Sequence, residues 1–386
     1  MMVGLQPEKP CNRCKKVSAL HKLRHETVCR DCFVGYVDAK VIKRLGALLR
    51  DIRTSQAPES RRYLTGLSFG QSSAALLQVL DSYRAYQASK KSSSSVEVLA
   101  IHVDTDLSCP GEVTETPAQR LLAKYREKYP NISLECVHLT KVLEVQTVDW
   151  SALPALRGAT DLERLRNLFD NLPSVTSKAD ILRLFIRHIL LNAAIENSSK
   201  VLLFGHTTTS LAALTLAEVA NGRGFAVPWQ VNDGPFTICT YDTTPEAAGK
   251  EVARSEFPVY YPMREVFKNE LATYVDLTPS LKELVQTGTS ATDNVVSHKD
   301  LSIEEVMTRY FSNVEGPYSG IVSNVVRTAG KLDRVASGRN CHMCSATLDE
   351  QGDSRWAGEM GDDPSDGSAS ASRGRLCYGC IRSIHG

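Results

Sequence analysis

The stretch Tyr63-Leu-Thr-Gly-Leu-Ser-Phe-Gly-Gln-Ser-Ser73 passes from an apolar run into a turn that contains glycine and serine. The run predicts a short strand from Tyr63 to Phe69, and the segment from Ser73 to Gln87 predicts a helix. At a turn between a strand and a helix, backbone N–H groups and the helix dipole are able to bind phosphate. Such turns are also common in α/β proteins that bind no phosphate. This stretch alone therefore predicts the fold class and leaves the ligand open.

Strands and helices alternate along the chain after this turn. Further strands are predicted at residues 96–103, 132–139, 200–204 and 256–261, and helices at residues 117–129, 161–171, 178–197, 210–221 and 263–275. This alternation is typical of an α/β protein with a parallel sheet, here of about five strands, and helices on both faces. Ligands of such sheets bind beyond the carboxyl ends of the strands, which are Ser68–Ser73, Asp104–Asp106 and Gly205–Ser210.

The composition indicates a folded chain without a membrane span. Of the 386 residues, 42% are hydrophobic and 23% are charged, which is enough apolar material for a core. The longest apolar runs, such as Val201 to Phe204, are too short to cross a bilayer. The residues before Cys11 lack the apolar centre of a secretory signal, so we expect a cytoplasmic protein that contacts no membrane.

Positive charge is concentrated near the N-terminus. The formal net charge is +1, yet residues 8–62 contain 14 lysines and arginines against 6 acidic residues. Such a segment favours a polyanionic partner, and the alternative is that its cations pair with the acidic remainder of the chain or face a partner subunit. The candidates for RNA binding are Lys15, Lys16, Lys22, Arg24, Arg30, Lys40, Lys43 and Arg44.

Eight of the eleven cysteines form four Cys-x-x-Cys pairs, two pairs near each end of the chain. Two such turns are able to surround one ion with four sulfur ligands, so each set of four predicts a structural zinc site without an open coordination position. An iron–sulfur cluster and metal-free thiols are the alternatives. Cys109, Cys136 and Cys239 are expected to be small buried side chains. The proposed metal ligands are Cys11, Cys14, Cys29 and Cys32 in the first set, and Cys341, Cys344, Cys377 and Cys380 in the second.

The turn at Ser68 resembles the phosphate loop Ser-Gly-Gly-x-Asp-Ser of the PP-loop ATP pyrophosphatases. Phe69 stands in place of the first glycine and Ser72 in place of the aspartate. We expect Phe69 to obstruct the approach of a phosphate, and Ser72 to remove an acidic group from the nucleotide site. The resemblance therefore implies a vestigial nucleotide site, in which ATP binding is in doubt, made of Ser68, Gly70, Ser72 and Ser73.

A second stretch, Gly205-His-Thr-Thr-Thr-Ser210, resembles the Gly-His-x-x-Asp-Asp stretch of active tRNA-thiolating members. Thr209 and Ser210 replace both acidic residues. Those members also have paired catalytic cysteines after the third strand, and this chain has no cysteine between Cys136 and Cys239. The resemblance thus implies that the chain has no catalytic residues of its own.

The chain as a whole resembles the cytoplasmic tRNA 2-thiolation protein 2 family. The resemblance rests on Cys29-Arg-Asp-Cys-Phe33, the altered loop at Ser68, Pro262-Met-Arg-Glu265 and Leu376-Cys-Tyr-Gly-Cys380. It implies a non-catalytic subunit that forms a heterodimer with a paralogous catalytic thiolase. That complex would take sulfur from a ubiquitin-related modifier and thiolate the wobble uridine of cytoplasmic tRNAs.

Two other functions compete with this interpretation. The chain could itself be an active ATP-dependent tRNA sulfurtransferase, which the missing acidic and cysteine pairs argue against. It could also be a zinc-ribbon nucleic-acid adaptor unrelated to thiolation, which the strand–turn–helix resemblance argues against.

The same features divide the chain into four parts. We expect a zinc module with a helix at residues 1–55 and a degenerate PP-loop α/β domain at residues 61–275. A helical region would occupy residues 276–338, and a second zinc module residues 339–386. The segment at about residues 351–374, rich in Gly, Ser and Asp, is expected to be a disordered insert in that module.

Overall fold

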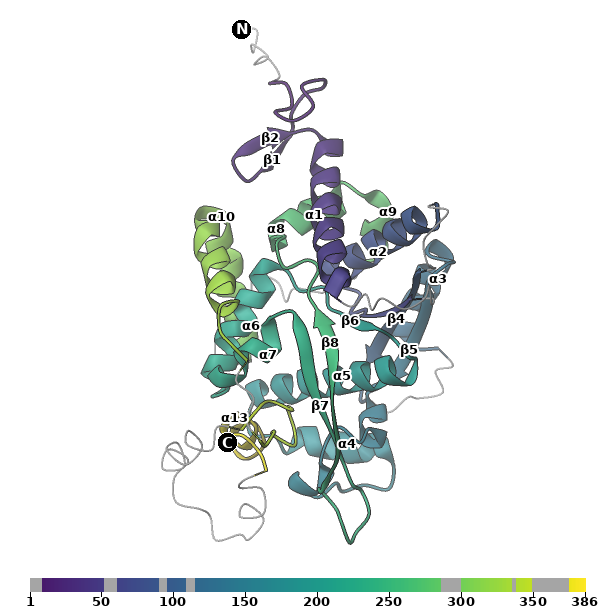
Figure 1. Cartoon of the computed structure of the whole chain (residues 1–386), viewed down its shortest axis with the longest axis vertical. Coiled ribbons are helices and arrows are strands. Elements are labelled where there is room, and N and C mark those ends of the chain that lie inside the picture. Colours follow the sequence, from purple (N-terminus) through teal and green to yellow (C-terminus); the bar gives the residue numbers. More distant parts are fainter. Residues whose placement is uncertain are drawn as a thin grey trace.

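The central sheet of the computed structural model has six strands in the order β5-β4-β3-β6-β8-β7 (Figure 1). The structure describes residues 9–51, 61–89, 96–108, 115–285, 300–334, 338–348 and 375–386. Neighbouring strands run parallel except at one edge, where β7 pairs antiparallel with β8. The predicted α/β fold is confirmed. The strands are β3 (Arg61–Gly66), β4 (Val96–Asp104), β5 (Ser133–His138), β6 (Val201–Leu203), β7 (Gly234–Tyr241) and β8 (Glu251–Tyr260).

The sequence-based prediction of five strands missed β7. Phe236, Ile238 and Tyr241 of this strand are buried, but Gly234 and Pro235 at its start are typical of a turn. Proline is tolerated in β7 because an edge strand has one side that needs no hydrogen-bonding partner. The sheet is therefore mostly parallel rather than parallel throughout.

Alternate residues of the strands face two separate cores. In β4, Val98 and Ala100 lie in one core, and Leu99 and Ile101 lie in the other. The first core includes residues of α1 (Arg30–Asp51), α2 (Gln71–Ser89), α3 (Pro117–Lys128), α8 (Lys268–Asp276) and α9 (Pro279–Lys282). The second includes residues of α4 (Asp161–Asp170), α5 (Val175–Glu196), α6 (Thr208–Ala220), α7 (Val227–Val231), α10 (Ile303–Ala329) and α13 (Tyr378–His385). Helices thus cover both faces of the sheet, as predicted (Figure 1). Short 3₁₀ helices lie at Leu139–Glu144, Trp150–Ala152 and Gly224–Ala226.

The helix predicted at residues 263–275 begins later in the structure. Two turns precede it, in which the Arg264 N–H donates to Tyr261 O and the Val266 N–H donates to Met263 O. The carboxylate of Glu270 accepts from the Phe267 N–H at 2.9 Å and closes the start of α8. The stretch at residues 262–265 is therefore a turn, and its Arg264 and Glu265 side chains reach neighbouring elements.

The turns after β3 and β6 meet at one edge of the sheet. From β3 the chain continues outward to β4 and β5, whereas β6 lies on the other side of β3. Sheets of this kind bind ligands at such a reversal of strand order. The two stretches that resemble the PP-loop family follow β3 and β6, so the fold brings them together.

The two cysteine-containing segments lie toward opposite ends of the molecule (Figure 1). The first contains the hairpin of β1 (His21–Leu23) and β2 (Glu26–Val28) and leads into α1. The second consists of residues 338–348 and 375–386 and includes α13. The predicted insert at residues 351–374 lies outside the described residues, and the division into four domains stays a prediction. No helix in the described ranges is long and apolar enough to cross a membrane.

Candidate metal centres and the altered nucleotide site

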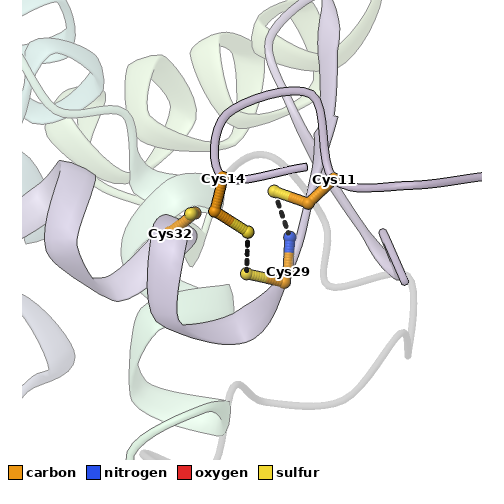
Figure 2. A group of neighbouring side chains, drawn as sticks. All are labelled: Cys11, Cys14, Cys29 and Cys32. Carbon is orange, nitrogen blue, oxygen red and sulfur yellow. Dashed lines mark hydrogen bonds between the residues drawn. The ribbon is translucent and has the colours of Figure 1, made fainter. Parts of the chain in front are cut away.

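Four cysteine sulfurs of the N-terminal segment lie within 4.8 Å of one another (Figure 2). Cys11 and Cys14 come from the turn before β1, whereas Cys29 and Cys32 stand at the start of α1. The sulfurs of Cys14 and Cys29 are 3.8 Å apart, and the described cysteines are free thiols rather than disulfides. Four sulfurs at about 2.3 Å from one tetrahedral ion would be about 3.8 Å apart. The first predicted ligand set is therefore brought together at a spacing that suits a single metal ion.

Backbone conformation and backbone hydrogen bonds fix the positions of these cysteines. Lys15 adopts φ 57° and its N–H donates to Cys11 O, which closes the turn that carries two of the cysteines. The Cys29 N–H donates to the Cys11 sulfur at 3.2 Å. Burial opposes ionisation of Cys11, but backbone N–H groups of Cys14, Cys29 and Arg13 outweigh it and lower the pKa of Cys11 to about 6. A thiolate, the form that binds metals, is thus stabilised.

The C-terminal cysteines repeat this construction. The sulfurs of Cys344 and Cys377 are 3.7 Å apart, and the Cys377 N–H donates to the Cys341 sulfur at 3.3 Å. Ser345 has φ 59° and donates its N–H to Cys341 O, as Lys15 does in the first set. The second pair again stands at a helix start, because Cys377 directly precedes α13. Cys341, Cys344, Cys377 and Cys380 are all buried and within 4.8 Å of one another, so the second ligand set is also assembled.

A buried ion-pair cluster attaches the C-terminal module to the α/β domain. Arg223, which is 0% exposed, contacts Asp180 of α5 and Glu218 of α6, the latter at 2.9 Å. Ser383 of α13 donates to the same Asp180 at 2.6 Å. Sequence reasoning did not predict this cluster, because Asp180 lies 43 residues from Arg223 and 203 residues from Ser383 in the chain. Burial and charge make the cluster a structural joint rather than a surface feature.

Gly379, which lies between Cys377 and Cys380, allows the C-terminal module to pack closely against the α/β domain. A Cβ atom at Gly379 would lie 2.5 Å from Arg223 Cγ and 2.5 Å from Asn221 O. Only a residue without a side chain allows α13 to approach the end of α6 so closely. The stretch Leu376–Cys380 is thus explained by packing as well as by ligand spacing.

The turn after β3 is closed on itself. The hydroxyls of Ser68 and Ser73 are 3.1 Å apart, and Ser73 Oγ also accepts from the Ser68 N–H and donates to Gly70 O. Phe69 has φ 59°, and its ring is 1% exposed and stacks on His102 with centroids 4.1 Å apart. The prediction that Phe69 obstructs a phosphate is therefore wrong, because left-handed backbone turns its side chain into the core. Of the two substitutions in this turn, the replacement of the aspartate by Ser72 is therefore the one that changes the charge of the site.

The position of the first missing acid after β6 has a structural partner. Thr209 is 1% exposed and donates its hydroxyl to the Glu315 carboxylate of α10. Glu315 also accepts from the Asn269 N–H at 2.8 Å, while Thr209 Oγ accepts from the Lys268 N–H at 3.1 Å. This position therefore links α6, α8 and α10. Its neighbour Ser210 caps the start of α6 by accepting from the Thr207 N–H at 2.7 Å.

A cavity of about 610 Å³ lies between the turns after β3 and β6. Gly205 makes this junction tight, because a Cβ there would lie 3.1 Å from Ser72 C and O. Arg183 and Arg187 line the cavity, but the first pairs with Asp180 and Glu218, and the second binds Gln230 and the Tyr261 hydroxyl. Glu304 is the one carboxylate among the described lining residues. The described lining therefore contains no pair of acids that could hold a metal–nucleotide complex.

His206 borders the same cavity and is held neutral. Burial and then the neighbouring charges of Arg187 and Arg183 lower the pKa of His206 to about 3. A neutral imidazole offers no positive charge to a triphosphate. Cys239 is buried, Cys136 is partly buried, and Cys109 lies outside the described residues.

Half of the predicted RNA-binding cations have partners within the chain. Arg24 pairs with Glu270 at 2.8 Å and Lys40 with Glu265 at 3.3 Å. Arg44 pairs with both Glu265 and Asp233, and Arg30 donates to Leu277 O. These contacts attach the N-terminal module to the α/β domain. Ion pairs within the described ranges involve none of the other four, which are exposed: Lys15, Lys16, Lys22 and Lys43.

The fold and the two cysteine clusters define a class, an α/β protein with a mostly parallel sheet and a potential metal module at each end. In a comparison with solved structures, the chain is similar to the U34-tRNA thiolase NcsA from Methanococcus maripaludis, solved with its four-iron, four-sulfur cluster. The TM-score is 0.56 at 18% sequence identity, and the match covers 92% of this chain and 97% of that one. This similarity establishes the fold.

Sequence comparisons identify the family. Residues 302–371 match the family model described as cytoplasmic tRNA 2-thiolation protein 2. Proteins of that name from Pyrenophora tritici-repentis and Aspergillus clavatus are 34% and 28% identical. These matches cover 97% and 99% of this chain, and 94% and 98% of the two relatives. The chain belongs to the cytoplasmic tRNA 2-thiolation protein 2 family, as its sequence motifs predict.

Proposed function

We propose that the chain is the non-catalytic subunit of a heterodimeric complex that thiolates the wobble uridine of cytoplasmic tRNAs. Its partner would be a paralogous thiolase with an intact phosphate loop, and a ubiquitin-related modifier would supply the sulfur to the complex. The name of the family, cytoplasmic tRNA 2-thiolation protein 2, supports a reaction on tRNA in the cytoplasm. The division of labour between two subunits is our inference from the altered site.

The observation that carries this proposal is the structural use of Thr209. Adenylyl transfer depends on acidic groups that hold a metal ion near the phosphates. Here the first of those positions binds Glu315 and joins three helices, and the second caps α6 through Ser210. The sheet and its turns are present, but these two site positions contribute to packing and capping. This supports a function that depends on the protein's surface rather than on a catalytic site.

We also propose that each cysteine cluster holds one structural zinc ion. Sulfur separations of 3.7 and 3.8 Å suit four ligands on a single ion. In a four-iron cluster the cysteines bind different iron atoms, which would hold the sulfurs farther apart. A bound ion would supply folding free energy to the short N-terminal segment and would take no part in the chemistry.

Replacement of the endogenous chain tests the function. We expect cells that lack it to lose 2-thiouridine at the wobble position, measured by mass spectrometry of digested tRNA. Ser72→Ala should restore thiolation fully, because Ser72 lines the cavity but would hold no metal. Full thiolation without the chain would contradict a required subunit. Loss of rescue by Ser72→Ala, with the protein still folded, would instead favour an active sulfurtransferase.

A further inference from the structure

A groove of about 570 Å³ separates the N-terminal module from the last turns of α10. Its described lining contains six cationic side chains and two carboxylates. Arg24, Lys40 and Arg44 lie on the side of the N-terminal module, and Arg327 and Lys331 lie on the side of α10. In Figure 1, α10 and α1 stand on either side of α8, which contacts both. The groove is thus formed by parts of the chain almost 300 residues apart.

The turn at residues 262–265 fixes both sides of this groove. Arg264 donates to Val326 O of α10 at 3.0 Å and to Asn232 Oδ1 at 2.9 Å. The adjacent Glu265 binds Lys40 and Arg44 of α1, each at 3.3 Å. Because neighbouring residues hold opposite sides, the spacing of the groove is set before any ligand arrives.

The charges on the α10 side are available to a ligand. Arg327 lies in the last turn of α10, and Lys331 follows the helix in a turn that its N–H closes by donating to Thr328 O at 3.0 Å. Both side chains are exposed and both line the groove. Ion pairs of the described residues involve neither of them. The Asn232 side chain donates to Ala329 O at 2.9 Å and holds this end of α10 in place. Two unpaired cations on a fixed backbone suit a polyanion.

The basic surface continues along α1. A second hollow of about 370 Å³ shares Lys40 with the groove and also contains Tyr36 and Lys43. The Tyr36 ring has the guanidinium of Arg13 at 4.6 Å and the Lys40 ammonium at 5.6 Å from its centroid. Cations interleaved with an aromatic ring are typical of surfaces that bind nucleic acids.

We propose that the groove between α1 and α10 binds the sugar–phosphate backbone of tRNA, with Arg327 and Lys331 as its contacts at the C-terminal end of α10. This inference rests on the proposed function for the identity of the RNA. The proposed RNA surface is therefore not confined to the N-terminal cysteine module. It is a groove whose other side is the end of α10. Backbone contacts of this kind position an RNA and do not read its sequence.

The test uses the full chain with its thiolase partner and a wobble-uridine tRNA transcript. In one variant Arg327→Ala is combined with Lys331→Ala. The matched control combines Arg120→Ala with Lys124→Ala, two exposed cations with the same spacing on α3. We expect the α10 variant to bind tRNA about tenfold more weakly, and the slope of log affinity against log salt to flatten by about one to two units. The α3 variant should match the wild type.

Three outcomes would overturn or separate the proposals. An unchanged affinity and salt slope in the α10 variant would show that the groove does not hold RNA. Loss of the thiolase partner with tRNA affinity retained would assign the groove to an acidic protein surface and equally overturn the inference. If the groove binds tRNA but cells without the chain keep wobble thiolation, the inference stands and the proposed function fails.

Discussion

Replacement of Arg223 by methionine tests how the C-terminal module is attached. The side chain is fully buried, and its guanidinium neutralises Asp180 and Glu218, which are 2% and 0% exposed at their side chains. Methionine keeps most of the apolar stem and removes the charge. Removing one partner of a buried ion pair costs about 3–5 kcal/mol, because the other charge stays buried. Arg183 still contacts both carboxylates, so we expect the lower end, about 3 kcal/mol.

The loss should depend on pH in a defined direction. Burial opposes ionisation of Asp180, but the charges of Arg223 and Arg183 outweigh it and lower the pKa of that carboxyl. A carboxyl with a lowered folded-state pKa stabilises the fold above its unfolded pKa, and this contribution is lost as the pH falls. Without Arg223, the buried Asp180 carboxyl accepts a proton more readily. The difference between variant and wild type should therefore shrink toward acidic pH.

Urea unfolding of metal-loaded protein, followed by tryptophan fluorescence, measures this difference. The control is Arg164→Met, which removes an exposed pair with Asp161 and should cost less than about 1 kcal/mol. Adding Glu218→Gln to Arg223→Met should recover part of the loss, because it removes a buried charge. A loss below about 1 kcal/mol at neutral pH, or a loss that does not change with pH, would refute the reasoning.

Three further predictions concern the metal modules and the attachment of α1. Elemental analysis should find two zinc ions per wild-type chain. Cys341→Ser should retain one ion, and the control Cys136→Ser should retain both. A metal-free wild type would exclude the metal assignment. Gly379→Ala should lower the free energy of unfolding in urea by about 1–3 kcal/mol, because its Cβ would meet Asn221 O. The control Gly46→Ala, with open space around the new Cβ, should not destabilise the fold. Equal stabilities of the two variants would contradict the close approach at Gly379. Although burial opposes it, Lys40 and then Arg44 lower the pKa of Glu265. The protection of the α1 amides, measured as their exchange rate relative to the intrinsic rate at each pH, should therefore decrease as the pH falls through that pKa. Glu265→Gln should remove this pH dependence, and an unchanged pH profile in that variant would argue against the attachment of α1 through Glu265.

Local sequence patterns predicted the parts of the molecule that depend on local spacing. The Cys-x-x-Cys pairs determine which sulfurs share a turn, and both predicted sets assemble. The strands at β3, β4, β5 and β6 follow from apolar runs bounded by turns. These features need no knowledge of distant contacts, because a short segment dictates them.

The features that the sequence did not predict depend on distant partners or on backbone conformation. Arg24 and Glu270 are 246 residues apart in the chain, and Arg44 and Glu265 are 221 apart, so no local pattern links them. The α10 side of the basic groove was missed for the same reason. Phe69 was misjudged because its positive φ, which turns the ring away from the cavity, cannot be read from residue type. For the altered nucleotide site, residue types therefore predicted the charge but not the direction in which the Phe69 ring points.

The central claim, that this chain supports thiolation without catalysing it, is tested most directly by AMP release. The purified chain is incubated with ATP, tRNA and a sulfur donor, alone and together with its thiolase partner. We predict no AMP above background from the chain alone, and AMP release with tRNA thiolation when the partner is present. Ser72→Ala should leave the rate of the complex unchanged. AMP release by the chain alone at the rate of the complex, abolished by Ser72→Ala, would contradict the account.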